Sequence, residues 1–220
     1  MNIEIPAERT ILNGDLEIPR KARGVVLFAH GSGSGRHSPR NQFVAQELRK
    51  GRLATLLFDL LTEREESIDR DTAHLRFDVE LLASRLASAV EWVAEAREVR
   101  GLPIGCFGAS TGAAAALMAA ARGHEIAAVV SRGGRPDLAG VALEEVHVPV
   151  LLIVGANDRT VLNWNRQALG RLQGEKRLEI VSGATHLFEE PGALEQVAHL
   201  ARGWFERWLV GHVHSTVRAA

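Results

Sequence analysis

The sequence predicts an α/β fold, with a mostly parallel central sheet covered by helices on both faces. Short runs of apolar, partly β-branched residues alternate along the chain with segments of helical length. These runs are apolar on both faces, which is typical of strands in a sheet that is covered on both sides. The chain has 220 residues, which fits one domain better than two. We therefore expect a single domain over residues 1–220.

The predicted strands are the apolar runs themselves. The clearest runs lie at residues 24–29, 54–58, 126–130 and 148–154, and weaker ones at residues 102–107 and 177–181. The start of the chain differs from the rest. Residues 2–5 and residues 11–18, the latter broken at Asn13-Gly14, are expected to form short antiparallel strands at one edge of the sheet.

The predicted helices lie between these strands. Residues 77–97 form the clearest amphipathic helix, because apolar side chains recur there at steps of three and four. Further helices are expected between Ser38 and Gly51 and at residues 112–122, 161–172 and 191–209. The charged residues 63–71 are expected to form a solvated loop, and the tail, residues 211–220, to be loosely held.

The composition excludes several classes of protein. The formal net charge is −1 and the pI is about 6.8. Nucleic-acid and anionic-membrane binders need a basic surplus that this chain lacks, so neither partner is expected. The single cysteine, Cys106, excludes an intramolecular disulfide and a cysteine-rich metal site. No signal peptide or membrane-spanning run is visible, and the cytoplasm is the default expectation.

One motif suggests covalent catalysis. The segment Gly108-Ala109-Ser110-Thr111-Gly112 matches G-x-S-x-G and lies between a predicted strand and a predicted helix. A sharp strand-to-helix turn crowds its central residue, so small residues on either side have a mechanical purpose. Such a turn presents the Ser110 hydroxyl as a nucleophile. The alternative is a tight glycine-rich turn with an incidental serine.

A serine nucleophile needs a base and a group that orients the base. His186 follows the predicted strand at residues 177–181, and Asp158 follows the one at residues 148–154. Both therefore belong to the carboxyl edge of the sheet, where catalytic groups collect. The chain order Ser110, Asp158, His186 matches the order in one known class of catalytic triads. Individually, His186 could be a surface loop histidine and Asp158 a helix cap.

The reaction also needs donors for a developing oxyanion. The backbone N–H of Thr111, directly after Ser110, is one candidate. The second is the N–H of Ser32, in the glycine-rich segment 30–35 after the first long strand. A phosphate cradle is the alternative for this segment, but neither G-x-x-x-x-G-K-[ST] nor G-x-G-x-x-G fits it.

On four motifs the chain resembles the α/β-hydrolases and, within them, dienelactone hydrolase-like proteins. These motifs are His30-Gly31, Gly108 to Gly112, Gly155-Ala156-Asn157-Asp158 and Ala184-Thr185-His186. The resemblance covers nearly the whole chain. It implies an eight-stranded sheet, a hydrolase without metal or cofactor, and the roles of nucleophile, acid and base for Ser110, Asp158 and His186. Dienelactone hydrolases proper use a cysteine nucleophile where this chain has Ser110, so serine-type esterase activity is the expected reaction.

Two further features bear on the substrate. The segment between residues 131 and 148, where this fold usually carries a lid, is short, so no large cap domain is expected. Several residues at the predicted active edge are candidates for substrate binding: His30, Arg36, Arg40, Arg132 and Arg135. The arginines suggest an acidic ester or lactone, because a guanidinium can bind two oxygens of a carboxylate. Alternatively, the arginines pair with local acids, for which Asp59 and Asp137 are the obvious candidates.

The predicted function is hydrolysis of a small or medium carboxylic ester or lactone through an acyl-enzyme. Thioester hydrolysis, amide hydrolysis and acyl transfer would use the same residues. A non-catalytic binding module on the same fold is the alternative from a different class. The expected partner is a small-molecule ester or lactone, and the chain is expected to be a monomer or a homodimer.

Overall fold

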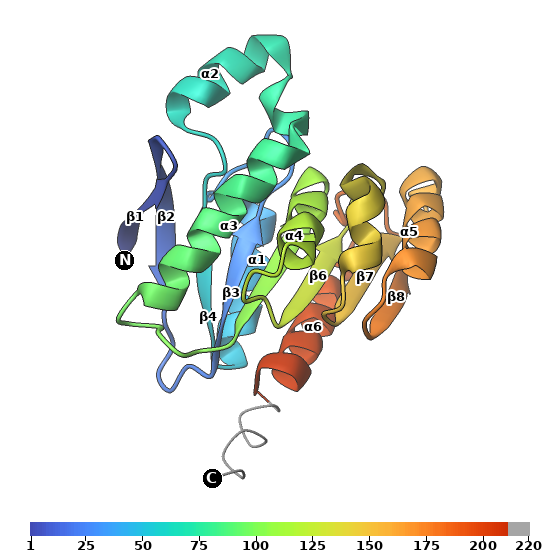
Figure 1. Cartoon of the computed structure of the whole chain (residues 1–220). Helices are drawn as coiled ribbons and strands as arrows, with labels where there is room; N and C mark the ends of the chain where they lie inside the picture. Colours follow the sequence, from blue (N-terminus) through green and yellow to red (C-terminus); the bar gives the residue numbers. More distant parts are fainter. Residues whose placement is uncertain (211–220) are drawn as a thin grey trace.

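The computed structural model describes residues 1–210, which form an eight-stranded sheet in the order β1-β2-β4-β3-β5-β6-β7-β8 (Figure 1). The predicted tail, residues 211–220, lies outside the described residues. The strands are β1 (Asn2–Ala7), β2 (Thr10–Glu17), β3 (Gly24–Ala29), β4 (Leu53–Phe58), β5 (Ile104–Ala109), β6 (Ala128–Arg132), β7 (Val150–Gly155) and β8 (Lys176–Val181). Strand β2 pairs antiparallel with both β1 and β4, and the remaining pairings are parallel. The predicted fold class is confirmed.

Helices cover both faces of this sheet (Figure 1). One face carries α1 (Pro39–Lys50) and α6 (Ala193–Phe205), and the other carries α3 (Val79–Glu95), α4 (Thr111–Ala121), the 3₁₀ segment η2 (Pro136–Glu145) and α5 (Arg159–Arg171). All residues of β3 to β7 are buried, because each of their faces lies under a helical layer.

The main difference from the sequence prediction is helix α2 (Glu63–Thr72), which replaces the expected solvated loop. A capping box starts the helix: the Glu65 N–H donates to Thr62 Oγ1 at 3.2 Å, and the Thr62 N–H donates to Glu65 Oε2 at 2.7 Å. Together with η1 (Leu75–Phe77), α2 projects beyond the sheet between β4 and α3 (Figure 1). No large cap domain is present in the described residues, as predicted.

Further differences concern the limits of the elements. Strand β2 runs without a break through Asn13 and Gly14, because both residues keep their pairing with β1. The last predicted helix divides into α6 and a π-helical turn, η3 (Glu206–Val210).

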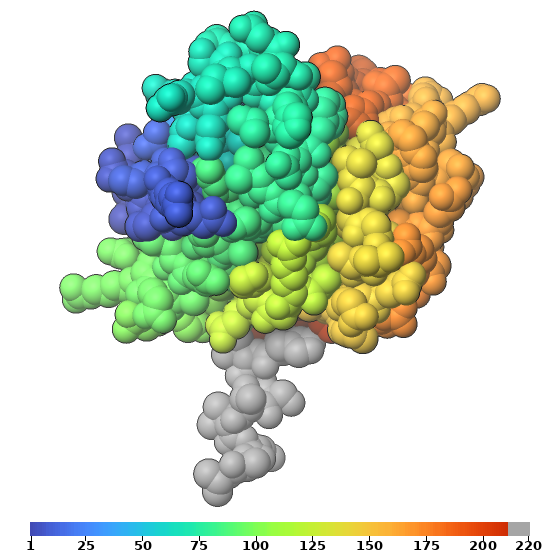
Figure 2. Space-filling view, turned by 45° about the horizontal axis from the view of Figure 1, so that its top comes forward, coloured from blue at the N-terminus to red at the C-terminus, as the bar shows by residue number. Residues whose placement is uncertain are grey.

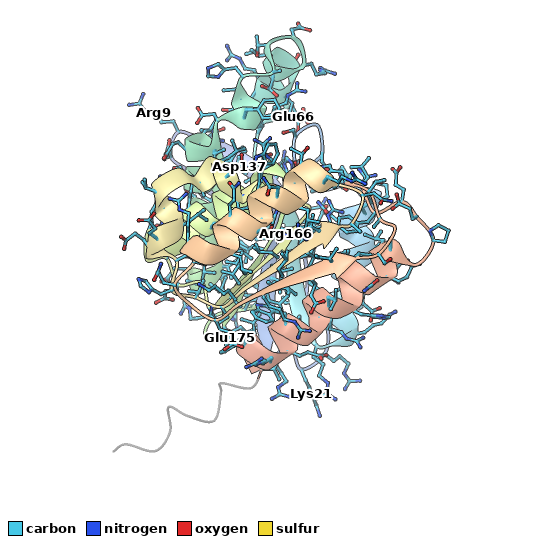
Figure 3. The ribbon with its side chains drawn as sticks, turned by 90° about the vertical axis from the view of Figure 1, so that its right-hand side faces the viewer. Arg9, Lys21, Glu66, Asp137, Arg166 and Glu175 are labelled. Atoms are coloured by element: carbon cyan, nitrogen blue, oxygen red, sulfur yellow. The ribbon has the colours of Figure 1, made fainter. Side chains whose placement is uncertain are left out.

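The six parallel strands place their carboxyl ends at one end of the sheet. In Figure 3, Lys21 and Glu175, which precede β3 and β8, lie at the opposite end from Glu66 on α2 and Asp137 in η2. Figure 2 turns the carboxyl end toward the viewer, with the teal α2 segment and the orange-red segment between β8 and α6 at its top. Among residues 1–210, no helix is both long and apolar enough to cross a bilayer.

Candidate active site

Ser110 lies at the turn from β5 into α4 in a strained backbone conformation, with φ 50° and ψ −119°. Glycine is required on both sides of it. A Cβ at Gly108 would collide with Ala113 Cα, and one at Gly112 would collide with the Ala29 carbonyl oxygen. The turn therefore matches the expected strand–turn–helix geometry around a nucleophile.

Asp158 and His186 meet at the same end of the sheet. His186, in the loop between β8 and α6, donates from Nδ1 to Asp158 Oδ2 at 2.6 Å. Asp158 stands at the N-cap position of α5, yet its carboxylate makes no capping hydrogen bond. The carboxylate therefore binds the imidazole. The alternative interpretation, in which the Asp158 side chain caps α5, does not fit these contacts.

Ser110 and His186 are brought close through a shared neighbouring segment and form no direct hydrogen bond in the described structure. The Ser110 N–H donates to the Arg132 carbonyl at 3.2 Å. The next residue, Gly133, lies against His186: a Cβ there would be 3.2 Å from the His186 carbonyl oxygen and 3.4 Å from Nδ1. Catalytic hydrogen bonds are often long in a ligand-free enzyme and shorten when substrate binds.

The two predicted oxyanion donors, Ser32 and Thr111, lie side by side. Their hydroxyl oxygens are 3.2 Å apart, and a Cβ on Gly31 would come within 2.9 Å of Ser110 Cβ. The Thr111 N–H belongs to the first turn of α4, where backbone N–H groups have no partner within the helix. Both backbone donors therefore belong to segments in contact with the nucleophile.

His30 holds the Ser32 segment in place. Its Nδ1 donates to the Gly31 carbonyl at 3.0 Å, and its Nε2 accepts the Leu60 N–H at 2.9 Å. These partners require the neutral imidazole, and burial lowers the pKa of His30. Both ring nitrogens are thus engaged with backbone groups, although His30 also lines the cavity beside Ser32.

The four candidate arginines fall into two groups. Arg36 pairs with Asp59, and Arg135 makes two hydrogen bonds to Asp137, at 2.9 and 2.7 Å. These are the local partners that the alternative interpretation named. For Arg36 and Arg135, a carboxylate of the protein thus occupies the guanidinium that a substrate would need.

Arg40 and Arg132 are different. Arg40 pairs with the exposed Glu189, at 3.2 Å, and its Nε is buried without a partner. Arg132 is 9% exposed, its Nη1 has no partner, and no ion pair to it occurs within residues 1–210. Burial, together with the charge of Arg40, lowers the pKa of Arg132 to about 10. An uncompensated buried charge is costly, and within residues 1–210 it is Arg132, not the paired Arg40, that lacks a carboxylate partner.

A cavity of about 760 Å³ opens beside Ser32 and Thr111. Arg40 lines it from the start of α1, and Glu66 and Arg70 line it from α2. Burial and the neighbouring Asp59 raise the pKa of Glu66. The sequence prediction missed this wall because it treated residues 63–71 as a loop. The Thr62-x-x-Glu65 pattern was the available signal for the helix.

Within residues 1–210, no three side chains of histidine, cysteine, aspartate or glutamate are grouped so that they could hold a metal ion.

Comparisons with known proteins identify the family and the fold. The family model described as "Dienelactone hydrolase family" matches residues 22–208. The crystal structure of a dienelactone hydrolase from Anabaena variabilis is 54% identical and superposes with a TM-score of 0.93, covering 95% of this chain and 97% of that one. Est1E from Butyrivibrio proteoclasticus, at 15% identity and a TM-score of 0.78 over 94% of this chain and 98% of its own, shares the fold.

Curated relatives from two strains of Mycobacterium tuberculosis are 54% identical over 210 residues, and both carry the name "Putative phosphoribosyl transferase". The match covers 95% of this chain and 46% of each relative. The chain thus spans about half the length of these relatives.

Proposed function

Because the chain belongs to the dienelactone hydrolase family, we propose that it hydrolyses a small or medium carboxylic ester or lactone through an acyl-enzyme on Ser110. The observation that carries the proposal is the meeting of three groups at one end of the sheet. Ser110 stands on a strained turn between two obligatory glycines, and the His186 imidazole is held by Asp158 at 2.6 Å. A nucleophile, a base and an orienting carboxylate are the elements of a serine hydrolase.

The reaction proceeds in two halves. In the first, His186 Nε2 takes the Ser110 proton as Oγ bonds to the carbonyl carbon. The proton then passes to the leaving alkoxide, and the ester C–O bond breaks. In the second, His186 takes a proton from water, the water oxygen bonds to the acyl carbon, and the proton returns to Ser110 Oγ as the acid leaves. Asp158 holds the imidazole tautomer and stabilises the imidazolium.

Two backbone N–H groups, of Thr111 and Ser32, stabilise the oxyanion of each tetrahedral intermediate. Support for this assignment comes from the contact of both segments with Ser110. In addition, the hydrogen bonds of His30 to Gly31 and Leu60 hold the Ser32 segment in place. Donors that are in place before the reaction need no reorganisation in the transition state.

The substrate in this proposal carries an acidic group, bound by Arg132 and Arg40. The support is the buried Arg132 guanidinium, which has an unpartnered Nη1 and no ion pair within residues 1–210. A carboxylate would supply the missing charge and accept two hydrogen bonds.

A pair of esters tests this part of the proposal, one with a terminal carboxylate and one with its neutral amide. We expect Arg132→Gln to lower kcat/KM for the carboxylated ester by about 10- to 100-fold, the range for a lost charged hydrogen bond, and to leave the neutral ester unchanged. The exposed Arg166→Gln on α5 is the control. Equal losses on both esters would eliminate the acidic substrate.

Thioester hydrolysis and acyl transfer to an alcohol use the same residues and remain alternatives within this mechanism. Phosphoribosyl transfer is not assigned to this chain: the relatives with that name are about twice as long, and residues 30–35 match no phosphate-cradle motif. A non-catalytic module is the alternative from another class.

A fluorophosphonate probe separates enzyme from module. We expect stoichiometric labelling of the wild type and none of Ser110→Ala. A panel of ester, lactone and thioester substrates, run on both proteins, then identifies the bond that is cleaved. Folded wild type that neither labels nor turns over any of these substrates would refute the proposed function.

A further inference from the structure

The loop from Gly133 to Arg135, after β6, touches both the nucleophile and the base. Its Arg135 N–H donates to the Ser110 carbonyl at 3.0 Å. Its Gly133 lies against the His186 ring and donates from its N–H to the Ile153 carbonyl on β7 at 2.8 Å. Any shift of this loop would therefore change the distance between Ser110 and His186.

The loop contains two consecutive glycines, and glycine is the residue with the most backbone freedom. Gly133 also has a φ of +52°. Unsupported, such a segment would populate several conformations. Something must therefore hold it in the one that places Ser110 and His186 correctly.

Asn165 on α5 supplies this restraint. Its side-chain amide donates to the Gly134 carbonyl at 2.9 Å and to the Val161 carbonyl in its own helix at 2.8 Å. Both partners are acceptors, so the amide nitrogen must face them, and the orientation of the side chain is fixed. Asn165 is 0% exposed, which excludes bulk water from these bonds.

Stability alone does not explain this asparagine. Its Oδ1 is buried without a hydrogen-bond partner among the described residues. A buried unsatisfied oxygen costs about 1–3 kcal/mol, which an apolar residue of similar volume would avoid. The asparagine therefore stands where its amide is needed by the Gly134 carbonyl, at some cost to the helix that carries it.

A second contact joins the same helix to the same loop. The Arg135 guanidinium, held by Asp137, stacks over the Trp164 ring at 4.0 Å from its centroid. Trp164 and Asn165 are neighbours on α5, and the N-cap residue of α5 is Asp158, the partner of His186. One helix thus carries the acid at its start and reaches the nucleophile and the base through the loop.

We propose that Asn165 is a positioning residue of the hydrolase, supported by Trp164. It fixes Gly134 and thereby the Gly133–His186 contact and the Arg135–Ser110 hydrogen bond. This inference rests on the proposed function, since it concerns the geometry of the same three groups. Asn165 does not touch the substrate and acts only through the loop.

The test uses Asn165→Leu, which removes both N–H donors and keeps the branching at Cγ, and Asn165→Asp, which keeps the shape and turns the donor into an acceptor. The exposed Asn163, on the same helix, gives matched controls as Asn163→Leu and Asn163→Asp. Active sites are counted by fluorophosphonate labelling, and kcat and KM are measured per labelled site on the best substrate of the panel.

We expect full labelling of both Asn165 variants, a kcat per labelled site about tenfold lower, and a KM within about twofold of the wild type, as for a misplaced catalytic group. The Asn163 variants should match the wild type. If neither Asn165 variant folds, Trp164→Leu, at a half-buried side chain, carries the test with the same expected split between kcat and KM.

Two results would overturn the inference. In one, kcat per labelled site equals that of the wild type, whatever the yield of labelled sites. In the other, the Asn163 variants lose as much kcat as the Asn165 variants. Either result with a wild type that labels and turns over substrate refutes the role of Asn165 alone, whereas an unreactive wild type refutes the proposed function.

Discussion

Gly133→Ala adds one methyl group beside the proposed base, and the structure gives the size of its effect. Gly133 has a φ of +52°, where an L-residue costs about 1–2 kcal/mol relative to glycine. In a protein of this size, that loss lowers Tm by roughly 2–8 °C. The new Cβ would also lie 3.2 Å from the His186 carbonyl oxygen and 3.4 Å from Nδ1. The His186 carbonyl must then give by a few tenths of an ångström, and this shift moves the residue that carries the imidazole. Since a 1 Å error costs about 100-fold, we expect kcat to fall about 4- to 10-fold.

Gly140→Ala separates the two effects. Gly140 has a φ of +53°, but a Cβ at this position would meet no atom within 4 Å. It should lose stability like Gly133→Ala and retain the wild-type kcat. The assay is ester hydrolysis per labelled site well below Tm, with thermal unfolding measured in parallel. An unchanged kcat in Gly133→Ala, or an equal loss in both variants, would show that the Gly133–His186 contact does not set the reaction geometry.

Three further predictions follow from single groups. Burial lowers the pKa of His30 below 6.5. Just below pH 6.5 the unfolded chain is therefore protonated at His30 and the folded chain is not, so the free energy of unfolding decreases as the pH falls. This part of the pH dependence should vanish in His30→Asn, as urea unfolding at pH 5 and pH 7.5 would reveal; parallel curves for both proteins would contradict it. Asp158→Asn should lower kcat by about 10⁴-fold through the wrong His186 tautomer, with Tm nearly unchanged; a loss below tenfold would remove Asp158 from the mechanism. Burial raises the pKa of Cys106 to about 12, so iodoacetamide at pH 8 should label it only in urea, and rapid labelling of folded protein would show that the thiol is accessible.

The fold could be predicted because the strands of the sheet are buried on both faces. Continuous apolar runs at β3, β4 and β7 leave no other arrangement for their side chains. Helix α2 was missed because nearly all of its residues are polar, and its stability comes from capping and ion pairs. An apolar period cannot identify such a helix, although its capping box could.

The residues of the candidate site also fall into those that the sequence predicts and those that it does not. Ser110, Asp158 and His186 could be named because each directly follows a predicted strand, and parallel strands bring their carboxyl ends together. Asn165 carried no such signal, since its contact with Gly134 depends on the path of a loop and not on spacing. The burial of Arg132 was also missed. Arg132 continues the face of Ala128 and Val130, but the strand was expected to end before it.

Several departures from the usual rules of stability lie near the carboxyl end of the sheet. Ser110 and Phe188 hold positive φ angles, Arg132 has no ion-pair partner within residues 1–210, and the Asn165 oxygen is unsatisfied. Positive φ angles elsewhere lie in turns, as at Glu8, or at a helix C-cap, as at Ala73. Each departure near His186 lowers the stability of the folded chain. It persists because the surrounding structure fixes the local geometry. Because these departures involve unconnected kinds of interaction but meet at one end of β5 to β8, a common requirement for that geometry explains them better than four separate accidents of packing.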